Sequence, residues 1–336
     1  MNDNKIACGI DIGTMNLCCS RSDSDEVKIT RNVFLTVDKE DILNQLSKIN
    51  YVEGPDDTYI IGSDAFDFAN MFGKKLSRPM ENGLISPKEI DAVDVLTLMV
   101  KDLIGVIKDK EVFCSYSIPA PAIDNERSVT YHEKVFGRIL HSIGVNYKSV
   151  NEAMAVIYSE CTKESFSGIG ISFGAGMANV AVAYKGIEAL TFSTTRSGDW
   201  IDNNVAKDLN MVPNRVTSLK ERHMQFDISL LQKIKKKTHK RVLEALLYQY
   251  ENMINYTIKK IIKEFDDKVD VEIDDELPIV ISGGTSIPEG FVSLFSERLN
   301  QYELPFEISE VRRAKNPLTA VSNGLLVRTI ADIKNK

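Results

Sequence analysis

Three short turns that contain glycine carry the residues whose types and spacing suit phosphate chemistry. They lie within residues 8–17, 171–180 and 280–288, and each follows an apolar, strand-like run. A glycine-centred turn lets backbone N–H groups point at a phosphate without a side chain in the way. The three turns are therefore candidate phosphate-binding segments.

The first turn also holds polar side chains with distinct chemistry. Asp11 would repel a bare phosphate, so its natural role is to hold Mg²⁺, directly or through water. Thr14 and Asn16 can add hydrogen bonds to phosphate oxygens. The glycines of the third turn would let a flat adenine or a ribose approach the backbone. Taken singly, each segment is equally well an ordinary tight turn.

The elements that must position these turns occur twice along the chain. Strands are expected at 6–10, 17–21 and 27–31, and again at 169–173, 179–184 and 187–193. The two sets lie about 160 residues apart, a spacing too long for a solenoid repeat. This echo predicts two lobes of common design.

Helical patterns and two further strands lie between the elements named so far and after them. A strand at 112–118 and a buried strand at 279–282 alternate with helices expected at 126–143, 242–265, 289–299 and 317–333. Alternating strands and helices are typical of α/β layers. The sequence therefore predicts an α/β protein.

Several motifs together resemble those of the superfamily of actin, sugar kinases and DnaK-type chaperones, and within it the bacterial actins of the MreB and MamK kind. The resemblance covers about residues 5–330. It is carried by DIGTMN (11–16), RPMENGLI (78–85), IPA (118–120), NEAMA (151–155), RSGDWID (196–202), SGGTSIP (282–288) and PLTAVSNG (317–324).

The resemblance implies a two-lobed actin-like ATPase fold, in which duplicated ribonuclease H-like lobes have a nucleotide cleft between them. The first lobe is expected to comprise residues 1–150 and 315–336, with a small subdomain at about 32–85. The second is expected to comprise 151–314. Its small subdomain, at about 210–240, is expected to be reduced because little sequence is left there for a β-hairpin.

The resemblance also implies a role for each matching residue, with ATP and Mg²⁺ as cofactors. Asp11 would lie beside the metal. Glu152 would orient or deprotonate the attacking water, with capping of the following helix as the alternative. The phosphates would contact Gly13, Thr14, Met15, Asn16, Gly174, Ala175, Gly176 and Met177. The adenosine would contact Gly198, Asp199, Lys220, Gly283, Gly284, Thr285 and Ile287.

Some positions depart from the family pattern. Ser172 stands where the second phosphate motif has an Asp that organises Mg²⁺ and water, and Ala153 stands where the family has Pro. Ala175 and Met177 replace the usual Gly and Thr. Slow hydrolysis, or binding without turnover, therefore remains an open alternative.

Composition narrows the class of protein further. The 336 residues have a formal net charge of −7, which argues against a nucleic-acid-binding role. No apolar run approaches the length of a membrane span, and the turn at 108–111 is fully charged, so direct membrane insertion is not expected. Five cysteines without a disulfide-like pattern suggest a cytoplasmic location.

Two charged segments remain outside these motifs. Residues 233–241 (KIKKKTHKR) form a basic cluster, and residues 266–276 form an acidic loop. The basic cluster is interpreted either as a solvated helix face or as a contact for a filament neighbour or an acidic partner.

The functional expectation is a cytoskeletal, cytoplasmic ATPase that self-assembles into filaments and serves an adaptor or cargo protein. The alternative is a nucleotide-binding module of the chaperone or reactivase kind that hydrolyses slowly or does not polymerise. A small-molecule kinase is disfavoured because nothing in the sequence resembles a substrate-binding insertion.

Overall fold

The computed structural model divides into two compact units, each described here by itself. Unit 1 comprises Met1–Ile118, Ser128–Asn151 and Val321–Lys336, and unit 2 comprises Pro119–Arg127 and Glu152–Ala320. The described residues are 4–37, 49, 51–53, 57–72, 74, 76–105, 107, 110–227, 229, 233–269, 273 and 275–335. Parts of the predicted acidic loop (270–272 and 274) and of the charged turn (108 and 109) lie outside them.

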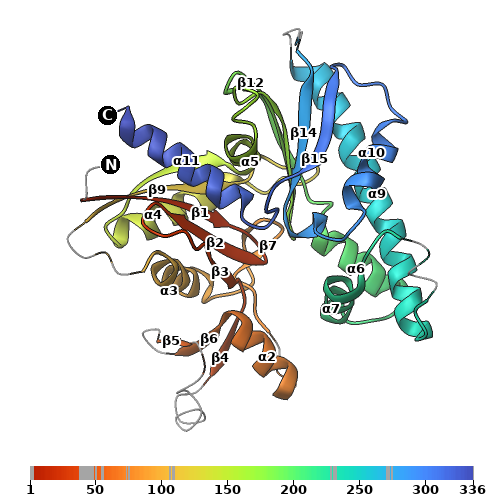
Figure 1. Ribbon diagram of the computed structural model, residues 1–336. Helices are drawn as coiled ribbons and strands as arrows, with labels where there is room; N and C mark the ends of the chain where they lie inside the picture. Colours follow the sequence, from red (N-terminus) through yellow and green to blue (C-terminus); the bar gives the residue numbers. More distant parts are fainter. Residues whose placement is uncertain are drawn as a thin grey trace. The chain divides into compact units, whose positions relative to one another are not determined.

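Unit 1 is built on a five-stranded sheet with the order β10-β9-β1-β2-β3 (Figure 1). Its strands are β1 (Lys5–Ile12), β2 (Asn16–Arg21), β3 (Lys28–Arg31), β9 (Glu111–Ile118) and β10 (Asn146–Asn151). The first three strands form an antiparallel meander, and β9 and β10 run parallel to β1.

Unit 2 repeats this sheet strand for strand, in the order β13-β12-β11-β14-β15. Its strands are β11 (Gly168–Phe173), β12 (Ala178–Tyr184), β13 (Ile187–Thr194), β14 (Leu277–Ser282) and β15 (Ile308–Arg313). The meander β11-β12-β13 is antiparallel, and β14 and β15 are parallel to β11. The predicted internal echo is therefore confirmed as a duplicated sheet.

The first hairpin of each sheet closes with a turn of the same length. Ile12 pairs with Leu17 in unit 1, and Phe173 pairs with Ala178 in unit 2. The intervening residues are 13–16 and 174–177, which are the first two predicted turns. The matching registers place the two turns at equivalent ends of the hairpins β1-β2 and β11-β12.

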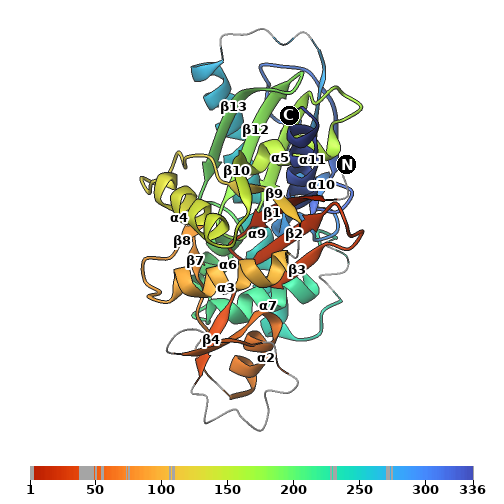
Figure 2. The same cartoon turned by 90° about the vertical axis from the view of Figure 1, so that its left-hand side faces the viewer.

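Helices cover both faces of the unit 1 sheet (Figures 1 and 2). They are α3 (Ala92–Ile104), α4 (Val129–Ser142) and α11 (Ala320–Lys334). The helix predicted to start at 126 starts at Val129 instead, because the Ser128 hydroxyl caps it by accepting a hydrogen bond from Thr130 N at 3.2 Å.

Small elements complete unit 1. A three-stranded sheet with the order β4-β6-β5 packs with helix α2 around its own apolar cluster, which includes Val33, Leu35 and Ile60. These elements are β4 (Phe34–Val37), β5 (Tyr51–Glu53), β6 (Thr58–Ile61) and α2 (Gly62–Phe72), and a separate two-stranded sheet pairs β7 (Met80–Glu81) with β8 (Leu84–Ile85).

The helices of unit 2 bury one large apolar core against its sheet. They are α5 (Glu152–Glu160), α6 (Gly198–Asp208), α7 (Pro213–His223), α9 (Lys237–Lys268) and α10 (Phe291–Leu299). Helix α9 extends beyond the predicted 242–265 at both ends, and it begins within the basic cluster 233–241. Within the described residues, no helix has both the length and the apolar character that a membrane span requires.

Strand alternation explains how each sheet is covered on two faces. Ile6, Cys8 and Ile10 of β1 face the core formed with α3 and α4. Gly9 faces the opposite way, where a Cβ would lie 2.2 Å from Ser322 O of α11. In unit 2, a Cβ on Gly170 of β11 would lie 2.5 Å from Ala153 O of α5. Each central strand thus needs glycine where a helix backbone crosses it.

We expect Gly9→Ala and Gly170→Ala each to lower the free energy of unfolding by about 1–3 kcal/mol, because the added methyl group overpacks a backbone contact. Urea denaturation measures the change. Gly284→Ala is a matched control, since its Cβ would meet only Leu318 Cδ1, at 3.9 Å. Equal losses in all three variants would contradict the close-approach explanation.

Candidate functional site

The first turn is held from beneath by the neighbouring strand β9. Ser117 of β9 accepts a hydrogen bond from Ile12 N at 2.7 Å and donates one to Asp11 Oδ1 at 3.0 Å. Asn32 Nδ2 donates to Gly13 O at 2.9 Å. A Cβ on Gly13 would lie 2.5 Å from Asn16 O, so the turn is too tight for a larger residue. Asp11 and residues 13–16 therefore form one rigid segment.

Thr14 is clamped by the segment that carries the RPMENGLI motif. Gly83 N donates to Thr14 Oγ1 at 3.0 Å, and Arg78 Nη2 donates to Thr14 O at 3.4 Å. The hydroxyl oxygen thus acts as an acceptor from Gly83, which leaves its proton free to point elsewhere. Sequence reasoning recognised this motif only by resemblance, and the structure gives it a physical role in positioning the first turn.

Asp11 is half-buried, in surroundings that disfavour its charged form. Burial raises the pKa of the Asp11 carboxyl to about 6, although the hydrogen bond from Ser117 acts in the opposite direction. Among the described residues, no group of three or more His, Cys, Asp or Glu side chains is arranged to hold a metal ion. A single half-buried carboxylate fits Mg²⁺ that takes its remaining ligands from phosphates and water, and it does not fit an all-protein metal cage.

In unit 2, the second and third turns meet at the carbonyl oxygen of Gly174. This oxygen accepts hydrogen bonds from Ser197 Oγ at 2.6 Å, Thr285 Oγ1 at 2.7 Å and Gly198 N at 3.1 Å. Asp199 N also donates to Ala175 O at 2.7 Å. The turn 174–177, the start of α6 and the third turn are thereby fixed to one another.

Glycine is required at two points of this junction. A Cβ on Gly198 would lie 2.5 Å from Thr285 Oγ1 and 3.2 Å from Ala175 Cα. Gly283 has φ of 88°, a left-handed conformation, and its Cβ would lie 2.3 Å from Phe173 O. Gly284 is exposed and Ile287 is 45% exposed, so both are accessible to a ligand.

Lys220 of α7 is tied to the same junction by a buried ion pair. Its ammonium lies 2.8 Å from Asp202 Oδ1 and donates to Gly198 O at 3.2 Å. The Asp202 side chain is only 3% exposed and also accepts a hydrogen bond from Thr217 Oγ1 at 2.6 Å. Burial raises the pKa of Asp202, while Lys220 opposes that shift. Lys220 therefore anchors the start of α6, whatever contact it makes with a ligand.

Glu152 is the first residue of α5, and a side chain from β12 orients it. Asn179 Nδ2 donates to Glu152 Oε2 at 2.9 Å, and Asn179 Oδ1 accepts from Ala120 N at 3.2 Å. The second contact determines which end of the Asn179 amide faces Glu152. The helix dipole also favours a carboxylate at the N-terminus of α5. Glu152 therefore stabilises the helix and is at the same time held in one orientation.

Ser172 occupies a buried place between two strands of the unit 2 sheet. It pairs with Asn179 on one side and with Ser282 on the other, and it is 2% exposed. The carboxylate expected at this position in the family is therefore replaced by a small hydroxyl in the core.

The structure brings the predicted residues together in two sets. Unit 1 holds Asp11 and residues 13–16. In unit 2, the residues 174–177, 198, 199, 220 and 283–285 gather around Gly174 O, and Glu152 lies at the start of α5. Sequence reasoning missed Ser117, Asn179 and Ser197, because each acts through a contact with a residue distant in sequence. Ser197 lies within the RSGDWID motif, directly before Gly198, and this position at a helix start is the only sequence signal that could have identified it.

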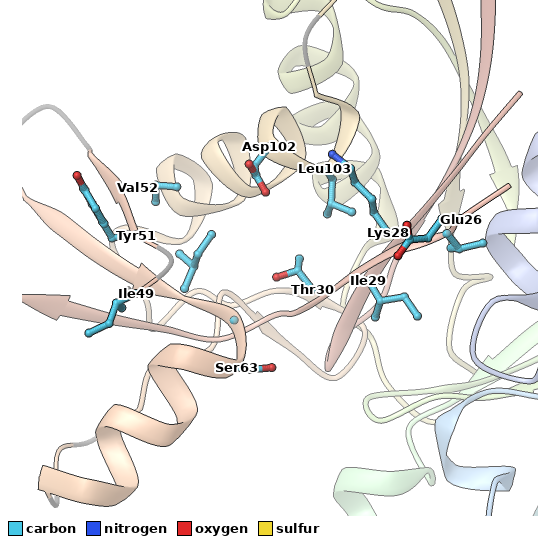
Figure 3. Close-up of a pocket in the computed structure, with 13 residues that line it drawn as sticks. Glu26, Lys28, Ile29, Thr30, Ile49, Tyr51, Val52, Ser63, Asp102 and Leu103 are labelled. Atoms are coloured by element: carbon cyan, nitrogen blue, oxygen red, sulfur yellow. The ribbon is translucent and has the colours of Figure 1, made fainter. Parts of the chain in front are cut away.

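A cavity of about 680 Å³ lies elsewhere in unit 1 (Figure 3). Lys28, Ile29 and Thr30 of β3 line it together with Tyr51 of β5 and Asp102 of α3. Its described lining mixes charges of both signs with apolar side chains and contains none of the predicted site residues. This composition is specific for neither a phosphate nor a metal ion.

The duplicated sheets and their matching hairpin turns define a two-lobed actin-like fold, which confirms the predicted fold class. The sequence matches the Volactin family over residues 6–329, and the chain therefore belongs to that family. A search of curated proteins finds no match.

Solved structures with this fold align over nearly the whole chain. A MamK double helical filament is 18% identical, with 99% of each chain covered and a TM-score of 0.71. MreB5 of Spiroplasma citri bound to ADP is 14% identical, with 98% of each chain covered and a TM-score of 0.64. The ethanolamine utilization protein EutJ from Carboxydothermus hydrogenoformans is 18% identical, with 96% of this chain and 89% of that chain covered and a TM-score of 0.54. The resemblance inferred from the motifs is confirmed at the level of the fold.

The raised pKa of Asp11 predicts a pH-dependent stability. The folded chain keeps a proton that the unfolded chain releases above about pH 4, so the free energy of unfolding falls as the pH rises to about 6, by at most about 3 kcal/mol. Asp11→Asn removes this titration. In urea denaturation without nucleotide or divalent cation, we expect the variant to gain stability over wild type between about pH 4 and about pH 8. A difference independent of pH would contradict this account.

The buried ion pair predicts a non-additive mutant cycle. Lys220→Met leaves the Asp202 charge buried without its cation, and we expect it to lower the free energy of unfolding by about 3–5 kcal/mol. Adding Asp202→Asn removes that charge and should restore more than half of the loss. Urea denaturation of both variants measures the coupling, and a double variant less stable than Lys220→Met would refute it.

Proposed function

We propose that this chain is an actin-like cytoskeletal protein that binds ATP with Mg²⁺ and assembles into filaments, with hydrolysis regulating the assembly. The observation that carries the proposal is the pair of equivalent hairpin turns, 13–16 and 174–177. Each turn closes a hairpin of an actin-like sheet and is held in place by hydrogen bonds. Spiroplasma citri MreB5, which shares the fold, is bound to ADP, and this supports a nucleotide as the ligand.

The first turn would bind phosphate through backbone N–H groups and the side chains of Thr14 and Asn16. Asp11 would hold Mg²⁺, which neutralises phosphate charge when bound. Residues 174–177 would bind the phosphates of the same nucleotide, and Gly284, Thr285 and Ile287 would face its adenosine. The exposure of Gly284 and Ile287 supports the adenosine assignment.

Glu152 would orient or deprotonate the attacking water, because phosphoryl transfer depends mostly on positioning. Its hydrogen bond from Asn179 supports a fixed orientation. Ser172 supplies no carboxylate for metal or water, so we propose that turnover is slow.

The fold shared with a MamK double helical filament supports self-assembly. Five free, buried thiols fit a reducing compartment, and we propose a cytoplasmic location. An adaptor or cargo protein would then use the filament.

The second candidate is a nucleotide-binding module of the chaperone or reactivase kind that hydrolyses slowly or does not polymerise. Ser172 in place of the acid favours this candidate, because loss of a carboxylate weakens catalysis without removing the binding turns.

Sedimentation with ATP and Mg²⁺, followed by electron microscopy of the pellet, tests the proposal. We expect filaments that require nucleotide. Protein that stays in the supernatant at every concentration, while still binding ATP, would favour the second candidate. Absence of ATP binding would contradict both.

Phosphate release separates catalysis from assembly. We expect Glu152→Gln to lower the rate about 10²-fold or more without weakening nucleotide binding. Ser172→Asp should raise the rate if the missing acid limits turnover. Wild-type rates in Glu152→Gln would remove Glu152 from its proposed role.

A further inference from the structure

Two imidazole rings from different helices meet on the surface of unit 2, outside the predicted site residues. Helix α7 packs beside the start of α9 (Figure 1). His223 is the last residue of α7 and His239 lies in the first turn of α9, and their ring centroids are 5.7 Å apart. His223 is exposed and His239 is half-buried. Among the described residues, no hydrogen bond or ion pair uses either ring, so both are accessible to a ligand.

The separation of the two rings matches that of two ligands on one metal ion. A transition metal binds an imidazole nitrogen at about 2.0–2.1 Å, which places the ring centroid about 3.2 Å from the metal. Two such centroids are therefore about 4.5 Å apart at a right angle and about 6.4 Å apart on opposite sides of the ion. The observed 5.7 Å lies within this range. Rotation about the broad χ2 torsion of each histidine can aim one nitrogen at the point between the rings.

The protonation state of His239 also suits a metal ligand. Partial desolvation, followed by the charges of Lys236, His223 and Arg215, holds the pKa of His239 below its ordinary value. At neutral pH the ring is therefore uncharged and has one nitrogen lone pair to donate.

The same basic neighbours oppose a bound cation, but only weakly. Lys236 and Arg215 are exposed, so water and salt screen their charges beyond about 8 Å. Bonds from two nitrogens act at about 2 Å, where this screening has no effect. The basic surroundings therefore lower the affinity of such a site and leave its geometry intact.

We propose that His223 and His239 together bind one late transition-metal ion, Zn²⁺ or Ni²⁺, and so join α7 to α9. Imidazole nitrogen is a preferred ligand of these ions, whereas Mg²⁺ and Ca²⁺ prefer oxygen. Among the described residues, no third His, Cys, Asp or Glu side chain is arranged to complete the set, so water supplies the remaining ligands. The site needs neither nucleotide nor assembly, and it goes beyond the proposed function.

Such a bridge restrains the helix that anchors the start of α6. His223 lies one turn after Lys220, whose ammonium pairs with Asp202 and donates to Gly198 O. The bridge also closes the chain between residues 223 and 239 into a loop, which removes conformations from the unfolded state. A metal bound here therefore stabilises α7 in its observed position against α9.

Isothermal titration calorimetry of the full chain, without nucleotide and in excess Mg²⁺, tests the site. We expect one Zn²⁺ or Ni²⁺ per chain and no competition from Mg²⁺, which prefers oxygen ligands. Mn²⁺ should bind much more weakly, because affinity for nitrogen ligands rises from Mn²⁺ to Ni²⁺. Absence of binding up to about 1 mM Zn²⁺ would overturn the inference.

Single and double variants identify the ligands. His223→Gln and His239→Gln should each weaken Zn²⁺ binding at least ~10-fold, since even the loss of a group that only orients a ligand costs about 10–100-fold. The double variant should bind about as weakly as either single variant, because one remaining imidazole cannot chelate. His141→Gln is the matched control, since His141 is exposed on α4 of unit 1. Wild-type affinity in either pair variant, or an equal loss in the control, would overturn the inference.

Stability and mass measurements test whether the ion joins two helices of one chain. Zn²⁺ should raise the melting temperature of wild type and of His141→Gln, and not that of the pair variants, because only an intact pair binds the ion in the folded state. Static light scattering should give the same mass with and without Zn²⁺. A larger mass that requires both histidines would assign the pair to metal bridges between copies and overturn the inference. Failure of nucleotide binding or filament assembly would leave these results unchanged, since the titration uses neither.

Discussion

The carbonyl oxygen of Gly174 is the point on which the unit 2 site depends. Three donors converge on it from two other segments, Ser197 Oγ and Gly198 N at the start of α6 and Thr285 Oγ1 in the third turn. A carbonyl with this many partners is costly to displace, since each donor would lose a buried hydrogen bond. The turn 174–177, the start of α6 and the third turn are therefore held together as one unit.

Unit 1 uses a different device for its equivalent turn. The Ser117 hydroxyl accepts from Ile12 N and donates to Asp11, so one side chain of β9 sets both the backbone and the carboxylate. Asp11 is left as a half-buried carboxyl whose pKa rises to about 6. Unit 2 has no carboxyl at the matching position, because Ser172 stands there in the corresponding strand. The duplicated sheet thus carries an asymmetric pair of turns, one with an acid and one without.

Sequence alone determined the α/β class, the internal echo and the three turns, because glycine, strand alternation and helical periodicity are local signals. It misjudged helix limits at Val129 and Lys237, where a Ser128 cap and exposed polar residues override the apolar pattern. Only the tertiary structure decided that Asn179 faces Glu152, that Lys220 pairs with Asp202, and that Arg78 and Gly83 clamp Thr14. Those contacts join residues from 18 positions apart (Asp202 and Lys220) to 69 positions apart (Thr14 and Gly83). Hydrogen bonding between distant side chains depends on the packed geometry, which no local pattern encodes.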